Sequence, residues 1–161
     1  MMNKDVTKGL YMSNKQGLQL NFKDKDGSIN LEKKGRILVA TFTGSCGDQI
    51  ANQMLKGVQN IVSDFADENW GFLSNALDYH AATPLAEAYY LQAYTLCHKM
   101  GCRYETYVCN SALGLAQMAK LRLRMGIKGP MKSVTFPSLN AAEKFLLNKL
   151  SPQQDTSQLT K

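Results

Sequence analysis

Residues 70–100 read WGFLSNALDYHAATPLAEAYYLQAYTLCHKM, and the organisation of the chain can be followed outward from them. The first part, Trp70–Leu77, is rich in apolar and aromatic residues and predicts a strand. Asp78–Ala82 predicts a short polar loop. Thr83 is a favoured N-cap residue and Pro84 suits the first position of a helix. A helix is therefore predicted from this point to the end of the stretch.

The predicted helix carries two apolar stripes at helical spacing. The stronger stripe predicts the face that packs on a sheet and consists of Leu85, Tyr89, Gln92, Ala93, Leu96 and Met100. The second consists of Ala86, Tyr90, Tyr94 and Cys97. One apolar face is enough to dock a helix, and tyrosine is favoured where one end is dry and the other wet. The second stripe is therefore interpreted as a face for a protein partner or a homodimer. The alternatives are tyrosines leaning on a neighbouring helix and one wall of a small apolar pocket.

Upstream, residues 1–26 offer little to bury and predict a mobile N-terminal extension. Within it, Leu18, Leu20 and Phe22 alternate as in a short edge strand. The domain is expected to span residues 27–150. It opens with a β-hairpin of residues 28–32 and 37–43, followed by a helix that Ser45 can cap.

Downstream, the pattern predicts a strand at 104–109, a helix over 111–125, a strand at 133–136 and a last helix capped by Ser138. Residues 151–161 form a polar tail. Strands that alternate with helices predict an α/β fold with right-handed crossovers and parallel central strands. The expected sheet is mixed and mostly parallel, with four to five strands, and four helices accompany it.

Several short motifs recur in the order and spacing of one family. They are Gly27-Ser28-Ile29, Gly35–Val39 with Gly44-Ser45, Trp70–Leu73 with Thr83-Pro84, and the ending Phe136, Ala142, Phe145 and Leu146. Over residues 27–147 the chain thereby resembles SpoIIAA-like, STAS-type domains. The resemblance implies a compact α/β domain with a mixed sheet, helices mainly on one face, and usually no catalysis.

The resemblance also bears on Thr83. Anti-sigma-antagonist domains of this type carry a phosphorylatable serine at the start of the corresponding helix, with an acid just before it. Here Thr83 stands at the N-cap, where a phosphate would suit the helix terminus, although a plain cap is the simpler interpretation. Many relatives have an acid in the strand where this chain has Asn75.

The sequence argues against an enzyme. It contains no phosphate-binding glycine loop, dinucleotide fingerprint, zinc-protease motif or nucleophile elbow. Asp78 and His80 share the predicted loop and are the candidates for acid–base chemistry, but loop residues that satisfy backbone groups are the alternative. The four cysteines form no C-x-x-C pair, and with the two histidines they complete no zinc pattern. No metal or cofactor is expected.

The charge and the hydropathy of the chain limit the classes of partner that we expect it to bind. The net charge is +6, with seven basic residues against one acid between Lys99 and Lys132. This cluster lacks the aromatic interleaving or helix-turn-helix pattern of nucleic-acid binders, so a nucleic-acid partner is not expected. No apolar run approaches the roughly 20 residues of a membrane span, and no signal peptide is recognised. A cytoplasmic location is expected.

The sequence leaves two functional hypotheses. The first is a non-enzymatic regulatory or protein-interaction module, working through a protein partner or a homodimer. The second is a binder or sensor of a small apolar or amphipathic ligand, with an adaptable interior built from Met54, Tyr89, Met100, Met118 and Met125.

Overall fold

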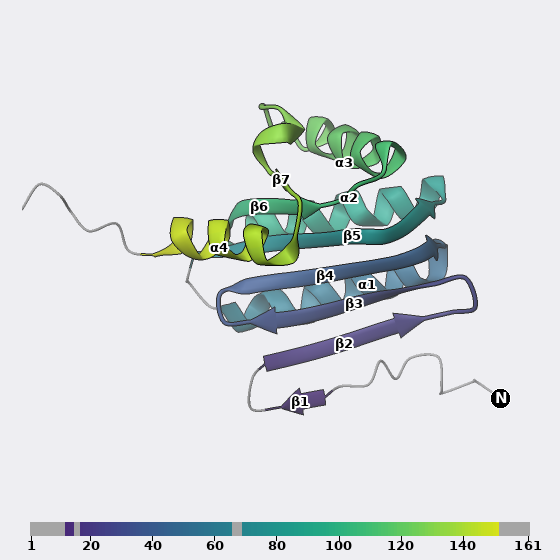
Figure 1. Ribbon diagram of the computed structural model, residues 1–161. Helices are drawn as coiled ribbons and strands as arrows, with labels where there is room; N and C mark the ends of the chain where they lie inside the picture. The colour runs from purple at the N-terminus through teal and green to yellow at the C-terminus, as the bar shows by residue number, and fades with distance from the viewer. Residues whose placement is uncertain (1–11, 15–16, 66–68, 152–161) are drawn as a thin grey trace, which may run out of the picture.

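The structure of the protein is a computed structural model that describes residues 12–14, 17–65 and 69–151 (Figure 1). In chain order its elements are β1 (Met12–Asn14), β2 (Gly17–Lys23), β3 (Gly27–Lys34), β4 (Ile37–Cys46), α1 (Asp48–Val62), the 3-10 helix η1 (Ser63–Phe65), β5 (Trp70–Ala82), α2 (Pro84–Lys99), β6 (Cys102–Val108), α3 (Ala112–Arg124), the 3-10 helix η2 (Met131–Ser133), β7 (Thr135–Phe136) and α4 (Leu139–Leu150). No helix in these described ranges is long and apolar enough to cross a membrane.

The strands form one seven-stranded sheet in the order β1-β2-β3-β4-β5-β6-β7, which is also their order in the sequence. The strands from β1 to β4 pair antiparallel, and those from β4 to β7 pair parallel. The predicted α/β fold with a mixed sheet opened by a hairpin is confirmed. The sheet is larger than the four to five strands expected, because β1 and β2 join it. Antiparallel pairs are therefore as numerous as parallel ones.

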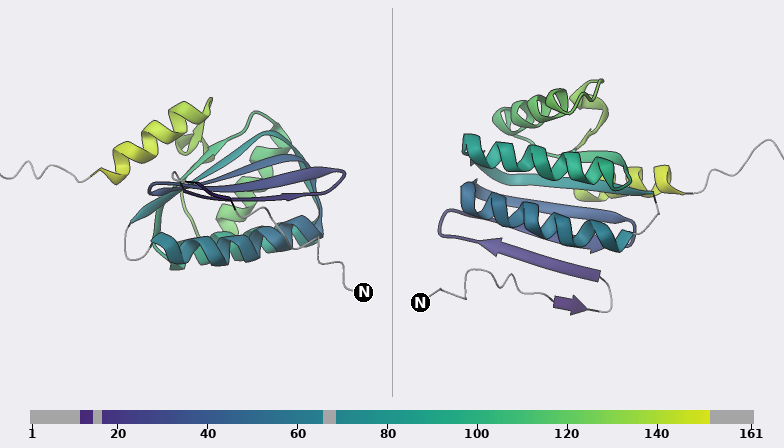
Figure 2. Two further views of the ribbon diagram at one scale, coloured as in Figure 1. Left: turned by 90° about the horizontal axis from the view of Figure 1, so that it is seen from below. Right: turned by 180° about the vertical axis from the view of Figure 1, so that it is seen from behind.

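Three of the four helices lie on the same face of the sheet (Figure 2). Right-handed crossovers between parallel strands laid down in sequence order place every crossover helix on one face. α1, α2 and α3 accordingly share the larger core cluster, which contains Met54, Tyr94 and Leu121. α4 covers the opposite face, where Leu146 clusters with Ile37. The prediction of helices mainly on one face is confirmed.

The N-terminal residues that the structure describes belong to the sheet. β2 pairs with β3 from Gln19 opposite Glu32 to Lys23 opposite Ser28. Leu20 is buried, and a Cβ added to Gly57 of α1 would lie 2.9 Å from the ring of Phe22. The fold therefore starts before the boundary expected at Gly27, and residues 17–26 are not a mobile extension. Residues 1–11, 15–16 and 152–161 lie outside the described ranges.

The turn between β2 and β3 is fastened to the end of β4. The backbone N–H of Ser45 donates to the carbonyl oxygen of Asp26 at 3.0 Å. Gly44 has a φ of +69°, and a Cβ there would lie 2.4 Å from the same carbonyl oxygen. Only glycine tolerates this combination of backbone conformation and close approach. The approach ties the first hairpin to the parallel half of the sheet.

β5 is longer than predicted and absorbs the expected loop. Residues 78–82 pair with β4, from Asp78 opposite Thr43 to Ala82 opposite Cys46, with register shifts between. Tyr79 is buried, whereas Asp78 and His80 are exposed, as the alternation of a strand requires. The loop prediction was wrong because pairing with the extended β4 satisfies these backbone groups and overrides the local preference for a turn.

α2 begins where the sequence predicts, but its faces are reversed. The Thr83 hydroxyl accepts from the backbone N–H of Ala86 at 3.1 Å, and Pro84 occupies the first turn. The side packed on the sheet consists of Ala86, Tyr90, Ala93, Tyr94 and Cys97. Leu85 and Met100, assigned to the core face, are 49% and 40% exposed. Small residues at Ala86, Ala93 and Cys97 let the helix approach the sheet closely, which leucine would prevent.

Candidate ligand pocket between α2 and α3

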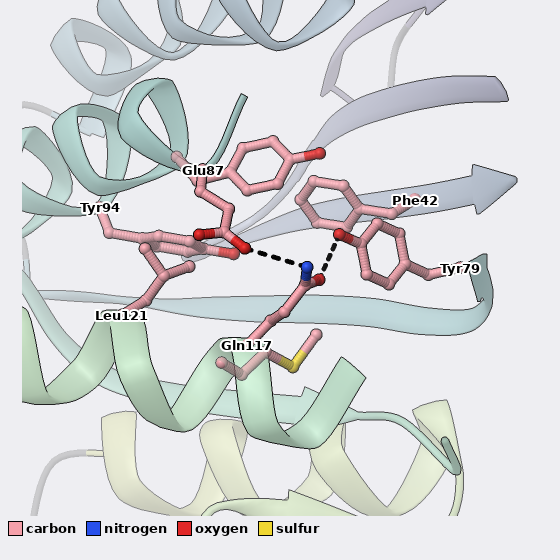
Figure 3. A pocket seen from close by; sticks show the side chains of 8 residues that line it. Phe42, Tyr79, Glu87, Tyr94, Gln117 and Leu121 are labelled. Carbon is pink, nitrogen blue, oxygen red and sulfur yellow. Dashed lines mark hydrogen bonds between the residues drawn. The ribbon is translucent and has the colours of Figure 1, made fainter. Parts of the chain in front are cut away.

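A hollow opens between α2, α3 and the ends of two central strands (Figure 3). Its free volume is about 20 Å³, and the whole hollow, counting the space that is open to solvent, is about 330 Å³. The lining residues come from four elements: Phe42 of β4, Tyr79 of β5, Glu87, Tyr90 and Tyr94 of α2, and Gln117, Met118 and Leu121 of α3. The free volume has room for about one water molecule.

The inner walls are aromatic. The ring of Phe42 meets Tyr79 edge-on at a centroid distance of 6.1 Å and meets Tyr90 edge-on at 5.4 Å. Tyr90 and Tyr94 are one helical turn apart on α2 and so face the sheet together. The hydroxyl of Tyr94 shares a hydrogen bond of 2.7 Å with Ser74 Oγ. This bond holds the tyrosine in place from the side of β5.

A chain of hydrogen bonds crosses the rim of the hollow (Figure 3). The Tyr79 hydroxyl donates to Gln117 Oε1 at 2.6 Å, and Gln117 Nε2 donates to Glu87 Oε1 at 3.0 Å. The other carboxylate oxygen of Glu87 lies 3.6 Å from Lys120 Nζ. The chain joins β5, α3 and α2, so that α3 is held over the hollow partly by polar contacts.

One phenol of the wall is unsatisfied. Within the described residues, the buried hydroxyl of Tyr90 has no nitrogen or oxygen partner, and the Cys46 thiol is the polar group beside it. Burial raises the pKa of Tyr90, and the neighbouring Cys46 thiol raises it further. Burying a polar group without a hydrogen bond lowers the stability of a protein by roughly 1–3 kcal/mol, so such groups are rare in protein cores.

Because four tyrosines are buried, we expect the free energy of unfolding to fall at high pH. Burial raises the pKa of Tyr79, Tyr90, Tyr94 and Tyr107 above its ordinary value. Below about pH 10 both the folded and the unfolded chain keep these protons, so the full stability is present. Above that pH the unfolded chain releases protons that the folded chain retains. The free energy of unfolding should then fall by up to about 1.4 kcal/mol per pH unit for each tyrosine.

The measurement is a titration of tyrosinate absorbance, followed in parallel by circular dichroism. The four buried tyrosines should titrate only as the folded signal is lost. If these four ionised near their ordinary pKa with the dichroism unchanged, the burial described above would be wrong.

The structure places the predicted interaction face inside the protein. Ala86, Tyr90, Tyr94 and Cys97 are 0%, 5%, 4% and 1% exposed. A partner cannot reach them in the folded state, so their interpretation as a protein contact or homodimer face is corrected. The alternative of a pocket wall fits two of them, because Tyr90 and Tyr94 line the hollow.

The predicted loop and cap residues do not form a site together. Within the described residues, no hydrogen bond joins Asp78, His80 and Thr83, and none of them lines the hollow. Thr83 donates its hydroxyl to the carboxylate of Asp48 at the start of α1. Its oxygen accepts from the first turn of α2. The cap therefore also fastens the starts of α1 and α2 to each other.

The part of the chain that the structure describes contains no cluster of metal-ligand side chains. No group of three or more histidine, cysteine or acidic side chains there is arranged to hold an ion. Cys46, Cys97, Cys102 and Cys109 are all buried and unpaired by disulfides. They act as small apolar residues of the core.

Most residues of the hollow were not recognised as a site from the sequence. Phe42 belongs to the predicted hairpin strand of residues 37–43, and no sequence motif marks Glu87 or Gln117. The signal that connects them is topological. Parallel strands β4 and β5 end at the same edge, where ligands of α/β folds commonly bind, and α2 and α3 start beside that edge.

Comparison with known proteins identifies the fold. No family model matches the sequence, and no curated protein matches it. Among solved structures, the chain is similar to an uncharacterized protein of the DUF3478 family from Shewanella loihica, which has a SpoIIAA-like fold. The match covers 84% of this chain and 98% of that chain, with 13% sequence identity and a TM-score of 0.55. At this identity the likeness is one of fold, and the chain has the SpoIIAA-like fold that its sequence predicted.

Proposed function

We propose that the protein is a non-catalytic binding module that takes a small amphipathic molecule into the hollow between α2 and α3. The observation that carries the proposal is the make-up of the lining. The inner walls are aromatic and aliphatic, while Tyr79, Glu87 and Gln117 bring polar groups to the rim. Small-molecule sites are typically apolar hollows with a few placed polar groups of this kind.

The arrangement of acids and histidines supports a non-catalytic role. In the described residues, one histidine lies within ion-pair distance of a carboxylate, namely His98 beside Glu105. Glu105 is buried and also accepts from the Tyr107 hydroxyl, so its oxygens are engaged in holding β6 and α2 together. A general acid or base must reach a substrate, and neither residue lines the hollow. Glu87 does line it, and its two carboxylate oxygens are engaged by Gln117 and Lys120.

The test is thermal melting of the purified chain with a panel of small amphipathic molecules of different head groups. A ligand that binds only the folded state stabilises it by about 2.7 kcal/mol at 100 times its dissociation constant. We expect at least one class to raise the melting temperature. Met118→Trp, which fills the hollow, should abolish the rise, whereas Leu113→Trp, on the exposed side of the same helix, should preserve it. No rise with any class, or a rise that Met118→Trp leaves intact, would refute the proposal.

Self-association is the second candidate, now on a different surface. The outward side of α2 carries exposed Leu85 and Met100 and borders an open groove against α1 that is lined by Leu91 and Leu96. Sedimentation at several concentrations should detect a dimer that Leu85→Glu dissociates. Leu147→Glu on α4 is the matched control, because Leu147 is 50% exposed and Leu85 49%. A monomer at every concentration would exclude this candidate.

A further inference from the structure

The charges around the hollow differ from those of an ordinary apolar site. Glu87 is the one charged residue among the described residues that line it. Four aromatic side chains, Phe42, Tyr79, Tyr90 and Tyr94, make up the opposing walls. Aromatic faces carry partial negative charge and attract cations within about 6 Å. Both kinds of wall therefore favour a positive group in the same small space.

From this arrangement we infer that the ligand is a small organic cation, a protonated amine with a short apolar tail. The inference rests on the proposed function and names the ligand class for the same hollow. The ammonium group would lie between the carboxylate of Glu87 and the aromatic walls. The tail would follow the open part of the hollow between α2 and α3.

The carboxylate of Glu87 already interacts with N–H groups of the protein, which occupy the position that we assign to the ligand's ammonium group. Gln117 Nε2 donates to one carboxylate oxygen at 3.0 Å, and Lys120 Nζ lies 3.6 Å from the other. Gln117 is a neutral donor whose amide can turn to present its oxygen, and an ammonium has three N–H groups to share. An entering ammonium can thus donate to both Glu87 and Gln117 without leaving either unpaired.

Lys120 competes for the same carboxylate from inside the molecule. Its side chain is 56% exposed, whereas that of Glu87 is 18% exposed. Because the lysine end of this ion pair lies in solvent, the attraction is screened and weak, so a ligand cation can displace the lysine at little cost. Removing the lysine charge should therefore strengthen binding of a cation. A variant that merely disturbed the pocket would weaken it.

Anionic and purely apolar head groups suit the lining of the hollow less well than a cation does. A carboxylate or phosphate would meet the negative charge of Glu87 and the electron-rich faces of the rings. A purely apolar head would strip water from Glu87 and Gln117 without replacing its hydrogen bonds. The free volume of the hollow is small, about 20 Å³, so a compact, unbranched ammonium suits it better than a branched head group.

The experiment compares hexylammonium, hexanol and hexanoate, which share one tail and differ in head-group charge. Affinities are measured by titration calorimetry on the full chain, with Met118→Trp to assign binding to the hollow. Hexylammonium should bind most tightly and hexanoate most weakly. Glu87→Gln should weaken hexylammonium about tenfold, because it removes one charge-assisted contact. Lys120→Gln should tighten it about threefold. Because hexanol carries no charge, both variants should change its affinity less than that of hexylammonium.

The outcomes separate the two proposals. If hexanol or hexanoate binds in the hollow as tightly as hexylammonium, the cation inference fails and the binding function stands. If hexylammonium binds but responds to neither Glu87→Gln nor Lys120→Gln, the assigned contact is wrong. If none of the three probes binds and the wider panel also fails, both proposals fall. Thermal melting of each variant shows that it is folded, and the rise in affinity for Lys120→Gln cannot arise from misfolding.

Discussion

Tyr94→Glu should leave the protein unfolded or aggregated, whereas Gln92→Glu should melt within a few degrees of the parent. Tyr94 is 4% exposed, its hydroxyl bonds Ser74, and its ring meets Phe72 edge-on at 4.9 Å. Losing a buried aromatic side chain costs about 3–5 kcal/mol, and an uncompensated buried carboxylate costs several more. The sum matches the whole stability of a typical domain, about 5–15 kcal/mol.

The readouts are circular dichroism and thermal melting. Gln92 is exposed on the opposite side of α2, so its change to glutamate adds the same charge without burying it. Tyr94→Phe removes only the hydroxyl and should cost about 1 kcal/mol. A folded Tyr94→Glu protein would show that this side of α2 faces solvent, as the sequence alone suggested.

Deleting residues 1–23 should destabilise the protein by about 3–6 kcal/mol, while deleting residues 1–16 should leave a stable fold. The longer deletion removes β2, including buried Leu20 and the Phe22 ring that packs against α1. Each such side chain contributes roughly 1.5–3 kcal/mol of burial. Its loss also exposes the edge of β3, where Leu31 is fully buried opposite Leu20.

Urea denaturation of the two truncated chains gives the comparison. Because both lack residues 1–16, the difference between them isolates residues 17–23. Leu20→Ala in the full chain should lose about 2–5 kcal/mol, which reports on β2 without changing the length of the chain. An equal loss in the two truncations would instead assign the stability to residues 1–16.

Some local signals in the sequence predicted local structure well, but the predicted Ser45 cap of α1 was wrong, because β4 continues to Cys46 and Gly47 precedes the helix. The Thr83-Pro84 start of α2 depends on two adjacent residues, and the apolar face of α1 is a single unambiguous stripe with Met54 and Val58 at its centre. The orientation of α2 could not be obtained in this way. Its two stripes are similarly apolar, and hydropathy ranks leucine above tyrosine. The sheet selects the other stripe because alanine and cysteine permit close packing and Tyr94 finds Ser74.

Features that depend on several elements were the ones missed. The pocket combines β4, β5, α2 and α3, and no sequence spacing relates Phe42 to Gln117. Arg122 illustrates the same limit. Helical spacing puts this residue at the edge of the apolar face of α3, where a charged end is expected to reach water. In the structure it is 7% exposed and its Nη1 donates to the Gly129 carbonyl oxygen at 3.4 Å. The loop that supplies this acceptor closes over α3 only in the folded protein.

The order of the strands also governs how the protein can be made. Since every strand pairs with its predecessor in the sequence, each new strand meets a ready edge as it leaves the ribosome. Each loop closure joins strands that are consecutive in the sequence, but a helix separates each parallel pair, so the parallel pairs should form more slowly than the antiparallel hairpins. The meander from β2 to β4 and α1 can assemble before α3 is translated. The wall that holds Gln117 and Met118 follows in the sequence, so a nascent chain that ends before α3 has no complete hollow that a ligand could stabilise.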